Sequence, residues 1–400
     1  MSKSKPLCRA PFANIYIDGD GNITPCCFNR NDILGNIYTD EWNAVWNGDK
    51  ALHLRKALSQ QIFPSGCHLC KKMMEQGNYY NSGIYTYNKL NYKTTKIQSI
   101  DFELSYYCNL SCIMCNLHEK QYRLSKEQET VILEKLKPLI PTLKKTRFYG
   151  GEPLVIPIYQ KIWERIIKEN PQCNILIQTN GMIINESIEN LAKGGNFTFN
   201  ISLDSLDAEN LSRIRKGANL SLILENLKQY KKQSKNSLTL TVTPMRLNWK
   251  EIPDMVRFAT KEHIQIFLNT LIQPKKLSIW TLPNASLQEI QQYYDSITLP
   301  VYSSIHLFNR IKFKHFARQI HEAYRSRPHY SSIELEKIMD ETIKILKEKI
   351  PSQPLDETLI RKFLTAYLEI HKKEEVLHFI NSSSEKELLS KIQNLLPEIR

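Results

Sequence analysis

The stretch Ser99-Ile-Asp-Phe-Glu-Leu-Ser-Tyr-Tyr-Cys108-Asn-Leu-Ser-Cys112-Ile-Met-Cys115 joins a candidate β-strand to three closely spaced cysteines in this 400-residue chain. The cysteines follow a C-x₃-C-x₂-C spacing, which is typical of an iron or zinc site. Four protein ligands close a metal site, whereas three leave one coordination position for another ligand. The stretch therefore predicts a metal site directly after a strand, with one position open for chemistry.

From this stretch onwards, strand and helix patterns alternate. The candidate strands are Ser99–Leu104, Thr146–Tyr149, Asn174–Gln178, Phe197–Leu203, Ser237–Thr243 and Ile264–Asn269. Amphipathic helices fit between them at 126–140, 157–169, 185–193, 219–232 and 249–261. Strands separated by helices predict right-handed βαβ units and a parallel sheet. The predicted fold class is α/β, with a partial (β/α)6 TIM-like barrel that has about three quarters of the eight units of a full barrel.

Polar, glycine-bearing segments follow strand after strand. After the cysteine loop come Gly150-Gly151-Glu152-Pro153, Thr179-Asn180-Gly181, Ser202-Leu-Asp204-Ser205, Met245-Arg246 and Asn269-Thr270. In parallel α/β barrels the carboxyl ends of the strands meet at one face, where the active site lies. The sequence therefore predicts an active site at this face.

The regions on either side of the alternating pattern differ from it. The predicted domains are a cysteine-rich region at 1–75, a Tyr- and Asn-rich linker at 76–98, the barrel at 99–275 and a helical region at 276–400. In the first region, Ile15–Ile17 and Ile23-Thr24 predict a hairpin, and 42–60 predicts a helix. Ser331-x-x-Glu334 and Ser384-x-x-Glu387 are capping-box candidates in the last.

Composition indicates an ordinary soluble globular protein, with 42% hydrophobic and 24% charged residues. No run of 18 uncharged apolar residues and no secretory signal occur, so we expect a cytoplasmic protein without a membrane partner. Nine cysteines in such a chain argue for metal binding rather than disulfides. Of these, Cys173 is expected to pack as a small hydrophobe. The net charge of +13 permits anionic partners, including nucleic acid, but a solvated lysine-rich surface is favoured.

These motifs together resemble those of radical S-adenosylmethionine (SAM) enzymes over roughly residues 99–270. The resemblance implies that Cys108, Cys112 and Cys115 are catalytic and bind a [4Fe–4S] cluster with one open iron, which takes SAM. It also implies a set of SAM-contacting residues, namely Met114, Gly150, Gly151, Glu152, Pro153, Asn180, Ser202, Asp204 and Arg215. Met114 departs from the family pattern, in which the residue before the third cysteine is commonly aromatic. A zinc loop, with His118 as a fourth ligand, is the alternative, but it leaves the Gly-Gly-Glu-Pro segment unexplained.

The N-terminal cysteines form a second group. Cys8, Cys26, Cys67 and Cys70, with glycines and prolines around them, resemble the SPASM/twitch module that holds auxiliary iron–sulfur clusters, although this module usually follows the barrel. The resemblance implies that these four cysteines bind a single auxiliary [4Fe–4S] cluster. Cys27 cannot be distinguished from Cys26 by sequence, and a zinc ribbon offers the same four-sulfur geometry.

The implied function is reductive cleavage of SAM to methionine and a 5′-deoxyadenosyl radical, which abstracts a hydrogen atom from a substrate. A flavodoxin or ferredoxin is expected to supply the electron, and the favoured substrate is a peptide that undergoes modification. A small molecule or sugar is the alternative substrate. A non-catalytic metal- or nucleic-acid-binding module is the alternative from another class.

Two weaker signals have structural explanations that are favoured over functional ones. The segment Phe308–Tyr330 is basic, with interleaved aromatic residues that could hold an acidic peptide or nucleic acid, but it fits a solvated amphipathic helix better. The tyrosines of 76–98 could line a substrate channel, but filling a domain junction is the simpler interpretation.

Overall fold

The computed structural model describes residues 5–75, 77–94, 96–116, 122–234, 238–351 and 356–395. The chain divides into two compact units. The first contains Met1–Thr270 and Leu299–Phe313, and the second contains Leu271–Thr298 and Lys314–Arg400. Within the described ranges, no helix combines the length and the apolar character needed to cross a bilayer.

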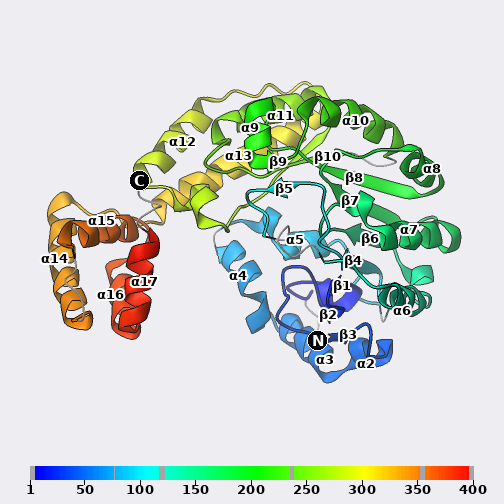
Figure 1. Ribbon diagram of the computed structural model, residues 1–400, viewed down its shortest axis with the longest axis horizontal. Coiled ribbons are helices and arrows are strands. Elements are labelled where there is room, and N and C mark those ends of the chain that lie inside the picture. The colour runs from blue at the N-terminus through cyan, green and yellow to red at the C-terminus, as the bar shows by residue number, and fades with distance from the viewer. Residues whose placement is uncertain are drawn as a thin grey trace. The chain divides into compact units, whose positions relative to one another are not determined.

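A nine-stranded sheet organises the first unit (Figure 1). Its strands are β1 (Asn14–Asp18), β2 (Asn22–Thr24), β3 (Gly35–Asn36), β4 (Ser99–Glu103), β6 (Lys145–Phe148), β7 (Asn174–Thr179), β8 (Asn196–Ser202), β10 (Thr239–Val242) and β11 (Gln265–Leu268). Their spatial order is β11-β10-β8-β7-β6-β4-β1-β2-β3. The neighbours from β11 to β1 are parallel, and all six predicted strands lie among them. The predicted α/β class with a partial barrel is confirmed.

The N-terminal hairpin extends the same sheet. β1 pairs antiparallel with β2, with Ile17 opposite Ile23, as the sequence predicts. β1 also runs parallel to β4, with Ile15 opposite Ile100. The cysteine-rich region therefore continues the barrel sheet at the β4 side, a long-range pairing that the sequence pattern does not show.

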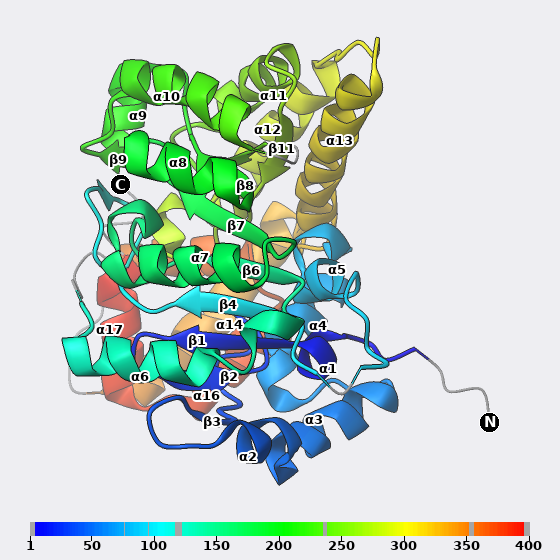
Figure 2. The same cartoon turned by 90° about the vertical axis from the view of Figure 1, so that its right-hand side faces the viewer.

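Helices follow the strands and cover one face of the sheet. They are α6 (Lys126–Leu136), α7 (Pro157–Glu169), α8 (Glu186–Gly194), α9 (Ala208–Ile214), α10 (Leu220–Gln233) and α11 (Ile252–Lys261). Figure 2 shows α6, α7, α8 and α10 arranged along the sheet. Beneath α7, the rings of Phe102 and Phe148 stack at 4.9 Å, and Trp163 meets Phe148 at 5.4 Å. This aromatic core fixes the outer face of the sheet.

The opposite, inner face is polar at the middle of the sheet. Side chains alternate along a strand, so Asp101 and Arg147 point away from Phe102 and Phe148. Both Asp101 and Arg147 are buried and paired with each other. Further along the same face, Gln178 and Asn200 are partly exposed. The inner face therefore provides a polar lining.

The predicted helix at 42–60 is wrong as a single element, because the structure has α2 (Trp42–Asn47) and α3 (Asp49–Ser59) instead. Gly48 between them is extended, and a Cβ there would lie 2.3 Å from the Ala44 carbonyl oxygen. The remaining N-terminal helices are α1 (Ala10–Ala13), α4 (His68–Glu75) and α5 (Gly83–Tyr87). The segment 76–98 therefore contains a helix rather than only extended chain.

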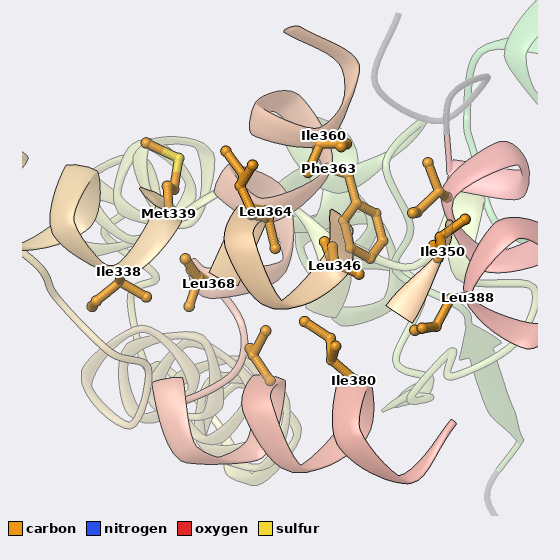
Figure 3. Packing of buried hydrophobic residues seen from close by; sticks show 13 residues of the cluster. Ile338, Met339, Leu346, Ile350, Ile360, Phe363, Leu364, Leu368, Ile380 and Leu388 are labelled. Atoms are coloured by element: carbon orange, nitrogen blue, oxygen red, sulfur yellow. The ribbon is translucent and has the colours of Figure 1, made fainter. Parts of the chain in front are cut away.

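The second unit is helical, as predicted. It contains α12 (Asn284–Ser296), α14 (Ser332–Lys349), α15 (Glu357–Leu368), α16 (Lys373–Ser382) and α17 (Glu385–Leu395). The boundary between the units falls within α13 (Ser304–Arg325). Figure 3 shows the core of α14–α17, where Leu346, Leu364 and Ile380 are among the buried side chains. Both predicted capping boxes, at Ser331 and Ser384, are present.

Candidate active site

The three cysteines of the triplet lie in the loop that follows β4. Within this loop, β5 (Ser111–Cys112) pairs antiparallel with β9 (Arg215–Lys216), which places Cys112 opposite Arg215. Outside this pairing, the Ile113 amide donates to the Ile214 carbonyl at 3.0 Å. The loop is therefore anchored to the segment after α9, about 100 residues away in sequence.

The Gly-Gly-Glu segment packs against the residues just before Cys108. The Gly151 amide donates to the Ser105 carbonyl at 3.0 Å, and the Glu152 amide donates to the Tyr107 carbonyl at 2.9 Å. Gly150 has a φ of +107°, a conformation that side chains rarely adopt. A Cβ at Gly151 would lie 1.8 Å from the Tyr107 carbonyl oxygen. The glycines thus permit the contact that positions the cysteine loop.

We expect Gly151→Ala to separate these two loops. A methyl group at 1.8 Å from a backbone oxygen requires backbone movement, and such overpacking costs about 1–3 kcal/mol. Urea unfolding of the variant should show this loss in the free energy of unfolding. Gly194→Ala is the matched control, because a Cβ there meets only Ile167 Cγ2 at 3.3 Å. Equal stability of the two variants would contradict this packing.

The Glu152 carboxylate is buried and joins two strand ends. Oε1 accepts hydrogen bonds from the Thr179 hydroxyl at 2.7 Å and from the Leu154 amide at 3.2 Å. Oε2 accepts from the Asn180 amide at 2.7 Å. A carboxylate has about four acceptor positions, so roughly one position remains, on Oε2. Glu152 therefore braces the neighbouring loops and keeps capacity for one further donor.

Burial raises the pKa of Glu152 to about 7, although its hydrogen bonds with Asn180, Thr179 and Leu154 oppose the shift. The folded pKa then lies above the ordinary value of 4.5, so the unfolded chain releases this proton first. Stability from this group is full below pH 4.5 and is lost as the pH rises through about 7, by up to about 3 kcal/mol.

We therefore expect the free energy of unfolding of the cofactor-free wild type, relative to Glu152→Gln, to fall between pH 4.5 and pH 8. Urea titrations across this range measure the difference. Glu164→Gln, at an exposed position on α7, is the control and should show no such slope relative to the wild type. A flat difference for Glu152 would contradict the raised pKa.

Asp204 and Arg215 form a buried ion pair beside the cysteine loop. Arg215 Nε donates to Asp204 Oδ2 at 2.7 Å, and Arg215 Nη1 lies 3.9 Å from Cys112 Sγ. The Thr243 amide donates to Asp204 Oδ1 at 2.6 Å. The Asn248 side chain donates to the carbonyl oxygen of Asp204 at 2.8 Å. The pair thus places a guanidinium next to one thiol of the triplet.

The other predicted residues lie nearby. Asn180 Nδ2 donates to Asn109 Oδ1 at 2.8 Å and lies 4.0 Å from Cys108 Sγ. Ser202 accepts a hydrogen bond from Gln178 at 2.9 Å on the inner face. Pro153 begins a short 3₁₀ helix directly after Glu152, and Met114 is partly buried in the cysteine loop.

Sequence analysis did not assign roles to four residues that hold this site together: Asn109, Thr179, Thr243 and Asn248. Thr179 belongs to a strand-end segment that the sequence does identify, so its position could have been inferred. Asn248 bonds to Asp204 from 44 residues away, and no local pattern signals that contact.

The arrangement bears on the zinc alternative. In the parts of the chain that the structure describes, no three His, Cys, Asp or Glu side chains are grouped to hold one metal ion. His118 lies outside the described residues. In an iron–sulfur cluster each thiolate binds a different iron, so the sulfurs need not converge on one point. The donor set of three thiols in one loop fits a cluster.

The N-terminal module has its own cavity. Cys8, Cys26, Cys67 and Cys70 all line it, together with apolar side chains such as Leu58. Burial raises the pKa of Cys8 to about 12 and that of Cys67 to about 11. Thiols held protonated in an apolar cavity must lose their protons to bind metal, so metal binding there releases protons.

Cys27 differs from its neighbour Cys26. It is absent from the cavity lining, and its Sγ lies 3.5 Å from the Tyr87 hydroxyl instead. The structure therefore separates the two adjacent cysteines that the sequence could not distinguish.

The residues of this site fall within a known family model. The model of the radical SAM superfamily matches residues 102–259, which contain the cysteine loop, Glu152 and Arg215. Residues 102–259 therefore form a radical SAM domain. A second model, an iron–sulfur cluster-binding domain called SPASM, matches residues 8–72. The SPASM domain thus precedes the radical SAM domain in this chain, as predicted.

The two families bind [4Fe–4S] clusters and SAM, which are therefore the cofactors of the two matched domains. The chain offers donors suited to them. Three thiols lie in one loop beside Arg215, and four thiols line the cavity of the SPASM domain.

Curated relatives include GTP 3′,8-cyclases. That of Clostridium botulinum is 26% identical over 157 residues, or 38% of this chain and 47% of the relative. That of Synechocystis is 29% identical over 178 residues, or 43% of this chain and 53% of the relative. That of Alkaliphilus metalliredigens is 31% identical over 146 residues, or 35% of this chain and 43% of the relative. The match with this chain spans about half of each relative.

Solved structures also show similarity to this chain. The structure of anSMEcpe with bound AdoMet and Cp18Cys peptide is 19% identical, with a TM-score of 0.39, and the match covers 50% of this chain and 58% of that one. Streptococcus suis SuiB bound to precursor peptide SuiA is 18% identical, with a TM-score of 0.38 and coverage of 57% and 58%. The radical SAM and SPASM domains are identified by the family models and not by these similarities.

Proposed function

We propose that this enzyme cleaves SAM reductively at the face of the barrel where Cys108, Cys112 and Cys115 lie, and modifies a peptide there. A single observation supports this placement. The cysteine loop, the Gly-Gly-Glu segment and the Asp204–Arg215 pair come from separate strand ends but form one hydrogen-bonded group. When bound and reduced by a flavodoxin or ferredoxin, the cluster and SAM supply a 5′-deoxyadenosyl radical that takes a hydrogen atom from the substrate.

The residues of the chain bind and orient. The three cysteines would hold three irons, and the remaining acceptor position of Glu152 Oε2 would take one N–H of the methionine ammonium. Gly150, Gly151 and Pro153 would fix the backbone beside it. Arg215, held by Asp204, would attract the methionine carboxylate. Asn180, Ser202 and Met114 would complete the contacts, with Met114 against the adenine.

A peptide substrate is favoured by the SPASM domain, because radical SAM enzymes that modify peptides carry a similar domain. A second candidate, a small molecule, is favoured by the match to GTP 3′,8-cyclases, whose name gives a nucleotide as substrate. The partly exposed Gln178 and Asn200 on the inner face could hydrogen-bond with either substrate.

Anaerobic reconstitution tests the proposal. We expect about eight irons per chain and release of 5′-deoxyadenosine when SAM and a strong reductant are added. Two zinc ions per chain, with no nucleoside product, would instead support a non-catalytic module.

We also propose that Cys8, Cys26, Cys67 and Cys70 bind a single auxiliary cluster, because these four line one cavity and Cys27 does not. Cys26→Ser should therefore lower the iron content by about four per chain, whereas Cys27→Ser should leave it unchanged. Iron analysis and iron–sulfur absorption after reconstitution measure both. The reverse result would assign the ligand to Cys27.

A further inference from the structure

The Tyr-rich segment 78–92 carries a feature that cluster and SAM binding do not use. Tyr79, Tyr80 and Tyr85 pack edge to face, with ring centroids 5.1–5.6 Å apart. The ammonium of Lys312 on α13 lies 4.6 Å from the Tyr80 ring and 5.1 Å from the Tyr85 ring. The Lys89 ammonium lies 5.0 Å from the same Tyr85 ring. Two positive charges therefore share one aromatic ring.

A third lysine extends this group. Lys145 begins β6 and points to the inner face, because it lies two residues before Arg147. Burial, together with repulsion by Arg147 and Lys89, lowers the pKa of Lys145 to about 8, although Asp101 opposes the shift. Burial also lowers the pKa of Lys312, and Lys89 again contributes. Lys89 is thus close enough to both to repel them. We call Lys89, Lys145, Lys312, Tyr80 and Tyr85 the basic–aromatic patch.

None of the five residues that define the patch is acidic. Among the residues that the structure describes, Asp101 is the acid that acts on Lys145, and its oxygens already accept from Arg147, Tyr87 and Asn14. For Lys312, the charged group that shifts the pKa is Lys89, which lowers it by repulsion. Like charges gathered without a counter-charge repel one another, and a bound anion would relieve that repulsion. Tyr80 is exposed at 37%, so the group is open to a ligand.

The position of the patch relates it to the proposed reaction. Lys145 lies at the amino end of β6, whereas Gly150 and Gly151 follow its carboxyl end. In Figure 2, α5 lies beside the starts of the strands and β9 beside their arrowheads. Five residues of strand separate Lys145 from Gly150, or about 17 Å at about 3.3 Å per residue. An extended peptide of about five residues spans the same length.

We infer that the basic–aromatic patch binds an acidic side chain of the substrate peptide. Carboxylates pair with Lys89, Lys145 and Lys312, and the rings of Tyr80 and Tyr85 cover the apolar part of the peptide. This inference rests on the proposed function, because it names the substrate class for the same barrel.

The test is a binding measurement on the full-length, anaerobically reconstituted protein without SAM or reductant. Fluorescein-labelled hexaglutamate is titrated and its anisotropy followed at low salt. We expect the Lys89→Gln/Lys145→Gln/Lys312→Gln variant to bind about tenfold more weakly than the wild type. Lys168→Gln, at an exposed position on the outer helix α7, should bind like the wild type. Because no SAM is present, failure here is distinct from failure to form 5′-deoxyadenosine.

Three outcomes would overturn the inference. Equal binding by the wild type and the triple variant would show that the patch is not the site. A loss of binding free energy in Lys168→Gln of about a third of that in the triple variant, one charge against three, would show that only net charge matters. Pyrophosphate that binds the patch more tightly than hexaglutamate would point to a phosphate-bearing small molecule. If the triple variant melts more than a few degrees lower, Lys89→Gln/Lys312→Gln, which leaves the sheet unchanged, replaces it, with a loss of affinity again expected.

Discussion

Replacing Cys112 with alanine is expected to reduce 5′-deoxyadenosine formation to the level of an enzyme-free blank. Two thiols cannot hold the three irons that leave the fourth open for SAM. The substitution also removes the partner of Arg215 Nη1, 3.9 Å away, and so leaves this edge of the site without its sulfur. We expect the iron content to fall by about four per chain. Iron analysis and chromatography of the nucleoside products measure both effects.

Two further variants make this expectation specific. Cys67→Ala should also remove about four irons but leave 5′-deoxyadenosine formation intact, while formation of the modified substrate stops. Cys173→Ala should change neither quantity, since Cys173 is buried outside both cysteine groups, with its Sγ 3.9 Å from the Asn174 carbonyl oxygen. SAM cleavage that survives in Cys112→Ala would refute the assignment of the radical cluster.

The second large effect is expected for Asp101→Asn, on the inner face of the sheet. Asp101 is fully buried and accepts two hydrogen bonds from Arg147, at 2.5 and 2.6 Å, and others from Tyr87 and Asn14. Removing the carboxylate charge leaves the guanidinium buried without a counter-charge. Such a change costs about 3–5 kcal/mol. Urea unfolding followed by tryptophan fluorescence should show this loss.

Two controls separate burial from charge. Asp254→Asn breaks the exposed pair with Arg257 and should cost less than about 1 kcal/mol. The double variant Asp101→Leu/Arg147→Met removes both charges and should cost less than Asp101→Asn alone, because no unpaired ion remains. A loss of stability as small as that of Asp254→Asn would show that Arg147 finds another partner or reaches water.

The strands, and the gathering of the candidate site residues at their ends, could be predicted because their signals are local. Alternation at a period of two marks a strand within a few residues, and each candidate ligand follows its strand directly. The topology of parallel sheets then places all carboxyl ends at one face. This is why Cys112 and Arg215, 103 residues apart, could be assigned to one candidate site together with Glu152 before the structure was known.

Other features depend on contacts between distant segments. The pairing of β1 with β4, which joins the N-terminal hairpin to the barrel sheet, has no local signature. The choice of Cys26 over Cys27 for the cavity lining follows from which side chain the turn after β2 directs inward. Gly48 breaks a helical pattern whose apolar spacing continues on both sides.

The cofactors of this protein could therefore be predicted from the sequence, since thiols, glycines and carboxylates at set spacings limit which cofactor can bind. Only the tertiary structure showed which acceptor positions and charges already have partners within the fold. Thr179, Leu154 and Asn180 donate to three acceptor positions of Glu152. Asp101, the acid that acts on Lys145, is already paired with Arg147. Burial is the reason, because a buried polar group must find its partners within the fold.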